Sequence, residues 1–306
     1  MSPRAPIRAP IRAPIRATAL AAIACALLTG PGRAQEVEVS PRRMLSAHEQ
    51  MEFRGIGRLD FGDGYCTATL FDDRHALTAA HCLFDEAGRR RPSAGMWFRA
   101  GLRDGAQQAV RQVRRAVPHP AYRWNGRLAS ASDIAVDVAM VELDQPLLTS
   151  EFPNYLPGDL PPPGGAVALL SYGQGRDRAL SLQEPCRVLQ RAGPVAQLDC
   201  EADPGSSGSP VLTRGPDGAL RLAGVISAKG RRLSYASAVS DTLPGLRQAM
   251  AAADVAPRRA LAPLMGAPAA GSAPMRAAPV PRDEPETRTL LPNRAGGWKS
   301  VRPPSE

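Results

Sequence analysis

Short apolar runs alternate with clusters of turn-forming residues between positions 56 and 239 of the chain. Most of these runs are shorter than a typical helix, and Gly, Pro, Asp and Ser recur between them. Antiparallel strands have this length and spacing, whereas βαβ units place a longer helical segment between strands. We therefore predict an antiparallel barrel or sandwich with strands at 65–70, 75–80, 96–98, 108–117, 138–143, 166–172, 186–189, 195–198, 210–212, 220–227 and 234–239.

A stretch rich in proline and glycine, 151–165, divides the predicted strands into two groups. Such a composition is typical of a connection between compact units. We expect one group of antiparallel strands over 56–150, a linker over 151–165 and a second group with a C-terminal helix over 166–255; the family resemblance described below implies that each group forms a β-barrel.

The C-terminal part of the chain changes character twice. Residues 242–252 carry Leu, Met and Ala at helical spacing, which predicts a helix with Asp241 or Thr242 as its N-cap. Farther on, Ala, Pro, Gly and Arg dominate with little apolar bulk. This composition predicts a disordered Pro/Ala/Arg-rich tail over 256–306.

The N-terminal region has the composition of a secretion signal. Residues 1–16 repeat Ala-Pro-Ile-Arg, and an apolar run over 17–28 follows them. That run is shorter than a bilayer requires, so we expect no stable membrane insertion. Small residues at the end of the segment predict cleavage after Ala34, which makes 1–34 a signal peptide. Residues 35–55 are polar and are interpreted as a pro-segment or an N-terminal arm.

The formal net charge of +9 is concentrated at the two ends of the chain. Residues 1–34 contribute +5 and residues 256–306 contribute +4, whereas 35–255 carries 25 basic and 25 acidic residues. A nucleic-acid-binding domain carries its excess of positive charge on the folded part. The neutral centre of this chain therefore argues against nucleic acid as a partner.

Two motifs contain side chains suited to nucleophilic catalysis. The first, Leu-Thr-Ala-Ala-His-Cys over 77–82, places His81 at the predicted tip of a strand. The second, Asp-Pro-Gly-Ser-Ser-Gly-Ser-Pro-Val over 203–211, contains Ser207. A serine hydroxyl becomes a strong nucleophile only when a neighbouring base takes its proton, and histidine is the usual base.

The order of these residues excludes one class of serine hydrolase. The α/β-hydrolases have Gly-x-Ser-x-Gly with the histidine downstream of the serine. Here Ser209 stands at the position of the last glycine, and all four histidines lie upstream of Ser207. The order His–Asp–Ser is instead that of the chymotrypsin class.

Two aspartates are candidates for the carboxylate that orients the imidazole. Asp133 and Asp137 both lie just before the apolar run that ends at Leu143. If Asp133 had this role, Asp137 would be an uncompensated charge in an apolar strand, which is costly. We therefore favour Asp137 and keep Asp133 as the alternative.

Together these motifs resemble those of the chymotrypsin-like (trypsin-fold) serine endopeptidases. The form Gly-x-Ser-Gly-Ser-Pro is similar to that of the bacterial secreted branch that includes the glutamyl endopeptidases. The resemblance implies an all-β fold of two antiparallel six-stranded β-barrels with a C-terminal helix, and an active site in the cleft between them. It implies that His81 is the base, Asp137 its partner and Ser207 the nucleophile. The backbone N–H groups of Gly205 and Ser207 would form the oxyanion hole.

The resemblance also implies a disulfide between Cys66 and Cys82, beside the histidine. Cys186 and Cys200 are the second local pair, but four cysteines allow three connectivities, so this pairing is an inference. Disulfides form in oxidising compartments, and we expect a secreted or periplasmic protein.

The sequence departs from the animal enzymes around the nucleophile. Most trypsins have an aspartate just before it, which pairs with the new N-terminal amine after activation; here Ser206 takes that place. We therefore expect an oxyanion hole that forms without this ion pair. Glu201, Ala202, Ser227 and Lys229 are the candidates for the specificity pocket. The preceding cysteine has a different spacing, so the preferred substrate residue stays open.

The resemblance predicts a serine endopeptidase that hydrolyses protein or peptide substrates through an acyl-enzyme intermediate. This chemistry requires no metal ion and no organic cofactor, and we expect a monomer. The alternative is a protease-fold binding protein that has lost turnover. Such relatives usually lack the histidine or the serine, and both are present here.

Overall fold

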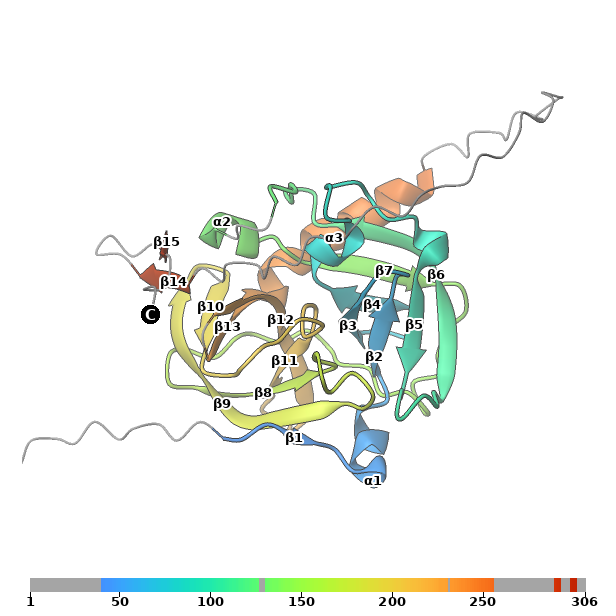
Figure 1. Cartoon of the computed structure of the whole chain (residues 1–306), viewed down its shortest axis with the longest axis horizontal. Helices are drawn as coiled ribbons and strands as arrows, with labels where there is room; N and C mark the ends of the chain where they lie inside the picture. The colour runs from blue at the N-terminus through green and yellow to red at the C-terminus, as the bar shows by residue number, and fades with distance from the viewer. Residues whose placement is uncertain (1–39, 127–129, 231, 256–288, 293–297, 302–306) are drawn as a thin grey trace, which may run out of the picture. The chain divides into compact units, whose positions relative to one another are not determined.

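A computed structural model describes residues 40–126, 130–230, 232–255, 289–292 and 298–301. Most of these residues form two β-barrels that lie side by side (Figure 1). The predicted signal peptide, 1–34, lies outside the described residues.

The first barrel is closed by six strands in the order β2-β3-β4-β7-β6-β5. The strands are β2 (Ile56–Asp60), β3 (Tyr65–Leu70), β4 (His75–Thr78), β5 (Trp97–Ala100), β6 (Ala109–Pro118) and β7 (Ala139–Leu143). Leu59, Phe98 and Val141 are fully buried inside it. A Cβ at Gly57 would lie 2.5 Å from the Phe98 ring, so the ring fills the barrel only because position 57 lacks a side chain.

The second barrel has the order β9-β10-β13-β12-β11-β8, and pairing of β8 with β9 closes it. Its strands are β8 (Ala166–Ser171), β9 (Ser181–Ala192), β10 (Val195–Leu198), β11 (Pro210–Arg214), β12 (Leu220–Gly230) and β13 (Leu233–Ala238). All these pairings are antiparallel. The predicted fold class, two antiparallel six-stranded barrels and a C-terminal helix, is confirmed.

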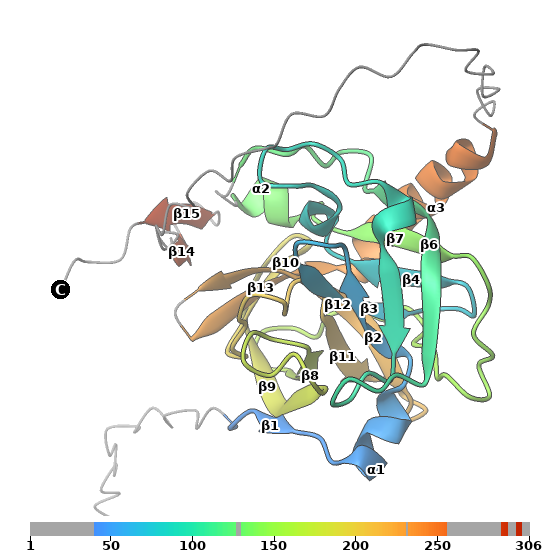
Figure 2. The same ribbon diagram turned by 45° about the vertical axis from the view of Figure 1, so that its right-hand side comes forward.

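One apolar cluster fixes the two barrels against each other. Leu77 and Met140 from the first barrel and Leu212 and Val225 from the second belong to the same buried group. The helix α3 (Val239–Val255) contributes further side chains to it, including Leu246. In the turned view, α3 runs beside β6 and β7 of the first barrel (Figure 2), and it also contacts β12 and β13 of the second, so the helix packs against both barrels. Sites built from both barrels therefore have a fixed geometry.

Some elements differ from the predicted bounds. The strand β9 extends well beyond the predicted 186–189. The sequence pattern did not reveal its full length, because the exposed positions of the strand include the polar residues Glu184, Arg187 and Gln190, which interrupt the apolar run. The helix α3 begins at Val239, so the expected cap at Asp241 or Thr242 was wrong. The Thr242 hydroxyl instead donates to the Ala238 carbonyl from inside the helix, at 2.9 Å.

The N-terminal arm is an ordered part of the fold from residue 40 onward. Strand β1 (Arg43–Met44) pairs with β9, and helix α1 (Ala47–Gln50) follows, with Ser46 as its N-cap. A 3₁₀ turn, η1 (Met51–Phe53), then leads into β2. Leu45 is buried in the cluster between the barrels. The arm therefore runs along the second barrel before it enters the first (Figure 1).

The remaining elements are short. They are η2 (Ala80–Leu83), η3 (Ser93–Gly95), α2 (Ala131–Ile134), and the strands β14 (Thr289–Pro292) and β15 (Trp298–Val301). The last two form an antiparallel hairpin within the tail that the composition predicts to be disordered. The other residues of 256–306 lie outside the described residues.

Both predicted cysteine pairs are joined in the structure, Cys66 to Cys82 and Cys186 to Cys200. The second disulfide links β9 to the segment after β10 and lies in the core of the second barrel. Each disulfide closes a short loop, with sequence separations of 16 and 14 residues.

We predict that the double substitution Cys186→Ala/Cys200→Ala lowers the free energy of unfolding by about 3 kcal/mol. A cross-link over a loop of roughly 15 residues restricts the unfolded chain by about this amount. Urea denaturation of both proteins under oxidising conditions measures the difference. An unchanged transition midpoint with an unchanged slope would contradict the prediction.

Candidate active site

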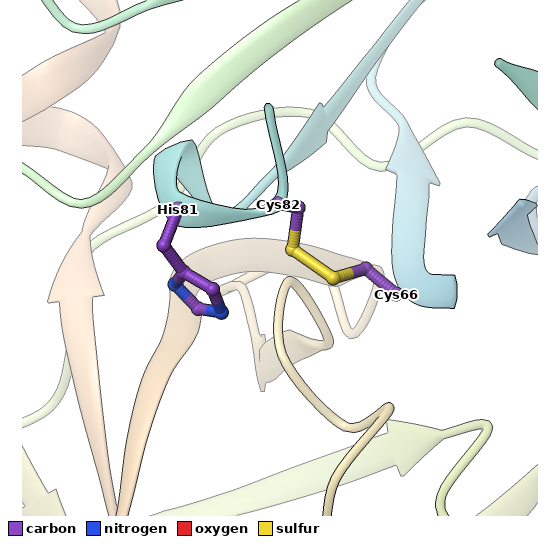
Figure 3. A group of neighbouring side chains, drawn as sticks. All are labelled: Cys66, His81 and Cys82. Atoms are coloured by element: carbon purple, nitrogen blue, oxygen red, sulfur yellow. A yellow bond between two sulfur atoms is a disulfide. The ribbon is translucent and has the colours of Figure 1, made fainter. Parts of the chain in front are cut away.

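His81 lies at the centre of η2, directly after β4. The disulfide from Cys82 to Cys66 joins this turn to β3, and Figure 3 shows the imidazole beside it. The His81 side chain is 29% exposed, so it is held by the fold yet accessible. Sequence reasoning expected His81 at the end of the strand, whereas β4 stops at Thr78 and the 3₁₀ turn delivers the ring.

Asp137 is buried and accepts three hydrogen bonds. Its Oδ1 accepts from the backbone N–H of His81 at 2.8 Å, and its Oδ2 lies 2.7 Å from Nδ1 of the same histidine. The hydroxyl of Ser227 donates to Oδ2 at 2.5 Å. A buried carboxylate is stable only when such donors satisfy it, so all three fix its position.

The alternative aspartate has another role in the structure. Asp133 lies in the first turn of α2, where its carboxylate accepts from the backbone N–H of Ser130 at 2.8 Å and from Asn125 at 2.7 Å. It is part of a capping box and caps the helix start. The structure therefore brings Asp137, and not Asp133, to the imidazole.

The surroundings of His81 act on its pKa in opposite directions. Burial lowers the pKa of the imidazole, but the charge of Asp137 and its hydrogen bond outweigh burial and raise the pKa above its ordinary value. Because Nδ1 donates to the carboxylate, Nε2 of the neutral ring carries the free lone pair. His81 can therefore accept a proton at Nε2 while Asp137 stabilises the resulting cation.

The loop that carries Ser207 begins with a tight turn. The backbone N–H of Ser206 donates to the Asp203 carbonyl at 2.9 Å, which closes a four-residue turn. Pro204 is its second residue, and Gly205 is its third with φ of 86°. This combination is that of a type II turn, in which the third residue needs a positive φ and favours glycine.

Gly208 lets this loop approach the first barrel. A Cβ at position 208 would lie 2.2 Å from both the carbonyl oxygen of Thr67 and the hydroxyl of Thr78, and its φ is 79°. The Thr67 N–H donates to the Ser207 carbonyl at 2.8 Å across the same contact. The loop is therefore hydrogen-bonded to β3 and packs closely against the end of β4, after which the chain leads into His81.

The backbone donors next to Ser207 are not used by the fold. Among the described residues, the N–H groups of Gly205 and Ser207 have no hydrogen-bond acceptor, whereas that of Ser206 closes the turn. The Thr67 hydroxyl donates to the Gly205 carbonyl at 3.0 Å and so fixes that peptide. Sequence reasoning missed Thr67, because a threonine in a strand carries no motif.

The four residues predicted for the specificity pocket lie in different environments. Glu201 forms an ion pair with the N-terminal arm, and Ala202 packs in the core of the second barrel. Lys229 is exposed on β12. Ser227 directs its hydroxyl at Asp137, a contact that the sequence did not indicate.

Two clusters in the described residues have the composition of metal ligands. They are Cys66 with His81 and Cys82, and Cys186 with Asp199 and Cys200. A metal-binding cysteine must be a thiolate, and all four sulfurs are consumed in disulfides. These clusters therefore do not fit a metal ion.

The sequence profile of the trypsin-like peptidase domain matches residues 66–220, which is half of the chain. The chain belongs to the trypsin-like peptidase family. The matched residues include His81, Asp137 and Ser207, together with both disulfides.

Among curated proteins, this trypsin-like peptidase is 30% identical to Serine protease 23 of Mus musculus over 175 residues, which cover 49% of this chain and 43% of that protein. It is 28% identical to Transmembrane protease serine 9 of Rattus norvegicus over 240 residues, 65% of this chain and 21% of the relative. The chain thus spans less than half the length of these relatives.

Among solved structures, a Glu endopeptidase in complex with MPD matches with a TM-score of 0.57. The match covers 69% of this trypsin-like peptidase and 97% of that chain at 15% sequence identity. At this identity, the likeness establishes the chymotrypsin-like fold alone.

We predict that Asp137→Asn lowers the pKa of His81. The substitution removes the negative charge that favours the imidazolium and leaves the burial that opposes it. Chemical shifts of the ring protons, followed against pH by NMR in both proteins, measure the change. A variant with native near-UV circular dichroism and an unchanged or higher pKa would contradict the pairing.

Proposed function

We propose that this protein is a serine endopeptidase in which Ser207, His81 and Asp137 form the catalytic triad. The observation that carries the proposal is the 2.7 Å contact between His81 Nδ1 and a buried Asp137 carboxylate. The Ser207 carbonyl accepts a hydrogen bond from Thr67 of β3, the strand that a disulfide joins to the turn of His81, and this supports Ser207 as the third member.

The reaction proceeds in two steps. The Ser207 hydroxyl attacks the carbonyl carbon of the scissile peptide bond while Nε2 of His81 takes its proton. The imidazolium, stabilised by Asp137, then gives that proton to the departing amine and leaves an acyl-enzyme. Water, deprotonated by the same imidazole, attacks the ester and releases the acid, and Ser207 regains its proton.

The N–H groups of Gly205 and Ser207 would stabilise the negative charge that develops on the carbonyl oxygen. Both donors are free of protein acceptors within the described part of the chain, and such donors need no reorganisation during the reaction. In enzymes of this kind, loss of one donor typically costs about 10²–10³ in rate.

Within the family, the bacterial secreted branch that includes the glutamyl endopeptidases is the proposed placement. It rests on the run Gly-Ser-Ser-Gly-Ser-Pro over 205–210. The proposed substrates are proteins or peptides, and the preferred residue at the cleavage site is not assigned.

The proposed location is outside the cytoplasm, in the medium or the periplasm. Two disulfides support an oxidising compartment. The apolar segment and cleavage site proposed within 1–34 supply the export signal. In the described part of the chain, no helix has the length and hydropathy to cross a membrane.

We predict that a fluorophosphonate probe labels the wild-type protein and that Ser207→Ala abolishes both labelling and casein hydrolysis. The substitution removes the only atom that the probe can modify in the triad. Ser150→Ala, at an exposed serine, is the matched control and should retain both probe labelling and casein hydrolysis. If the folded wild-type protein is not labelled while trypsin is, the protein is a binding protein that has lost turnover.

We predict further that kcat/KM rises with pH through an apparent pKa above 6.5, the ordinary value for histidine. The base acts only when His81 is neutral, and Asp137 keeps it protonated to a higher pH. Rates on a peptide substrate between pH 5 and 9 provide the profile. An acid limb at or below the ordinary value would speak against His81 as the base.

A further inference from the structure

The side chain of Arg42 reaches from the N-terminal arm to the loop before Ser207. Its Nη1 lies 2.5 Å from Oδ2 of Asp203, and its Nη2 lies 3.4 Å from Oε2 of Glu201. Only 10% of the Arg42 side chain is exposed, so this is a largely desolvated guanidinium. The contact joins residues that are 161 positions apart in the chain.

Asp203 is the first residue of the turn that contains Gly205. Its carbonyl accepts from the Ser206 N–H at 2.9 Å, and its own N–H donates to the Ser206 hydroxyl at 3.2 Å. Its carboxylate receives a second guanidinium, Arg176, at 2.9 Å. The side chain and the backbone of Asp203 therefore both determine where the turn lies.

The arm holds Arg42 in place from both sides. The carbonyl of Ser40 accepts from Nε2 of Gln183 at 2.9 Å, and the N–H of Leu45 donates to the Leu180 carbonyl at 3.0 Å. Between these contacts β1 pairs with β9. Because β9 belongs to the second barrel, Arg42 and the Ser207 loop share one rigid support.

The residue just before the nucleophile is a buried, uncharged serine, Ser206. The carboxylate of this loop is instead Asp203, and its partners are the side chains of Arg42 and Arg176. A side-chain cation is present as soon as the chain folds, whereas a terminal ammonium at a new chain end requires cleavage.

We propose that Arg42 is a positioning residue for the oxyanion hole: it binds Asp203 and thereby holds the turn that presents the Gly205 N–H. This proposal rests on the serine endopeptidase function above. The N-terminal arm is then a working part of the enzyme, and competence does not depend on a newly cut N-terminus.

The charges around Asp203 are consistent with this role. Burial raises the pKa of the Asp203 carboxyl, but Arg176 and Arg42 together lower the pKa below its ordinary value. The ion pair with Arg42 is therefore intact above this lowered pKa and is lost as the pH falls through it. Without Arg42 the carboxyl would take up its proton at a higher pH.

The test compares Arg42→Met with Arg43→Met in the full chain. Arg43 is the adjacent residue and is a matched control, because its side chain is 54% exposed and pairs with Glu49 away from the loop. For Arg42→Met we expect a kcat lower by about 10- to 100-fold, KM within about twofold, and an equally slower rate of fluorophosphonate labelling. Arg43→Met should match the wild type.

Two further readouts separate positioning from a general loss of stability. Arg42→Lys keeps a positive charge and should recover part of kcat. In a double-substitution cycle, the variant with both Arg42→Met and Asp203→Asn should have a kcat no lower than that of the slower single variant. Each substitution disrupts the same ion pair between Arg42 and Asp203, so their effects should not add.

Specific outcomes would overturn the proposal. They are a folded Arg42→Met protein with wild-type kcat and labelling, or a change in KM alone. If Arg42→Met does not fold, Asp203→Asn is measured instead, and an unchanged kcat there overturns the proposal equally. Absence of labelling in the wild-type protein would refute the enzyme function itself, which is a distinguishable result.

Discussion

The carboxylate of Asp137 is the point on which the two barrels depend. It is buried and negatively charged, so it needs donors on every side. The first barrel supplies the backbone and ring of His81, and the second supplies Ser227 from β12. A relative shift of the barrels would remove the Ser227 donor from this buried charge, so the chemistry of the site and the alignment of the barrels are coupled.

Apolar packing between the barrels stabilises the alignment that the hydrogen bonds of Asp137 require. The apolar cluster between the barrels includes Leu77 and Met140, close in sequence to His81 and Asp137, and Val225, two residues before Ser227. The close approach at Gly208 adds a contact that admits no side chain at that position. Polar and apolar contacts therefore favour the same arrangement of the two barrels, and few other arrangements would satisfy both sets of contacts.

Local sequence patterns predicted what depends on neighbours in the chain. The alternation of apolar runs predicted an antiparallel barrel or sandwich, and the resemblance of the motifs around His81, Asp137 and Ser207 added the division into two barrels. The contact of Ser227 with Asp137 could not be predicted, because β12 and β13 change register between Ile226 and Ala228 and leave Ser227 as the extra residue. Such a bulge redirects a side chain, and no local pattern encodes it.

The arm also covers backbone that the barrel leaves open. The first residues of β9 pair with β8 on one side, while β10 joins the other side only from Val188 onward. Strand β1 fills that gap opposite Ser181 and Leu182. An unfilled strand edge invites pairing with other chains and hence aggregation. Proteolytic removal of the arm would thus expose an unpaired edge of β9, so the arm also contributes to the colloidal stability of the protein.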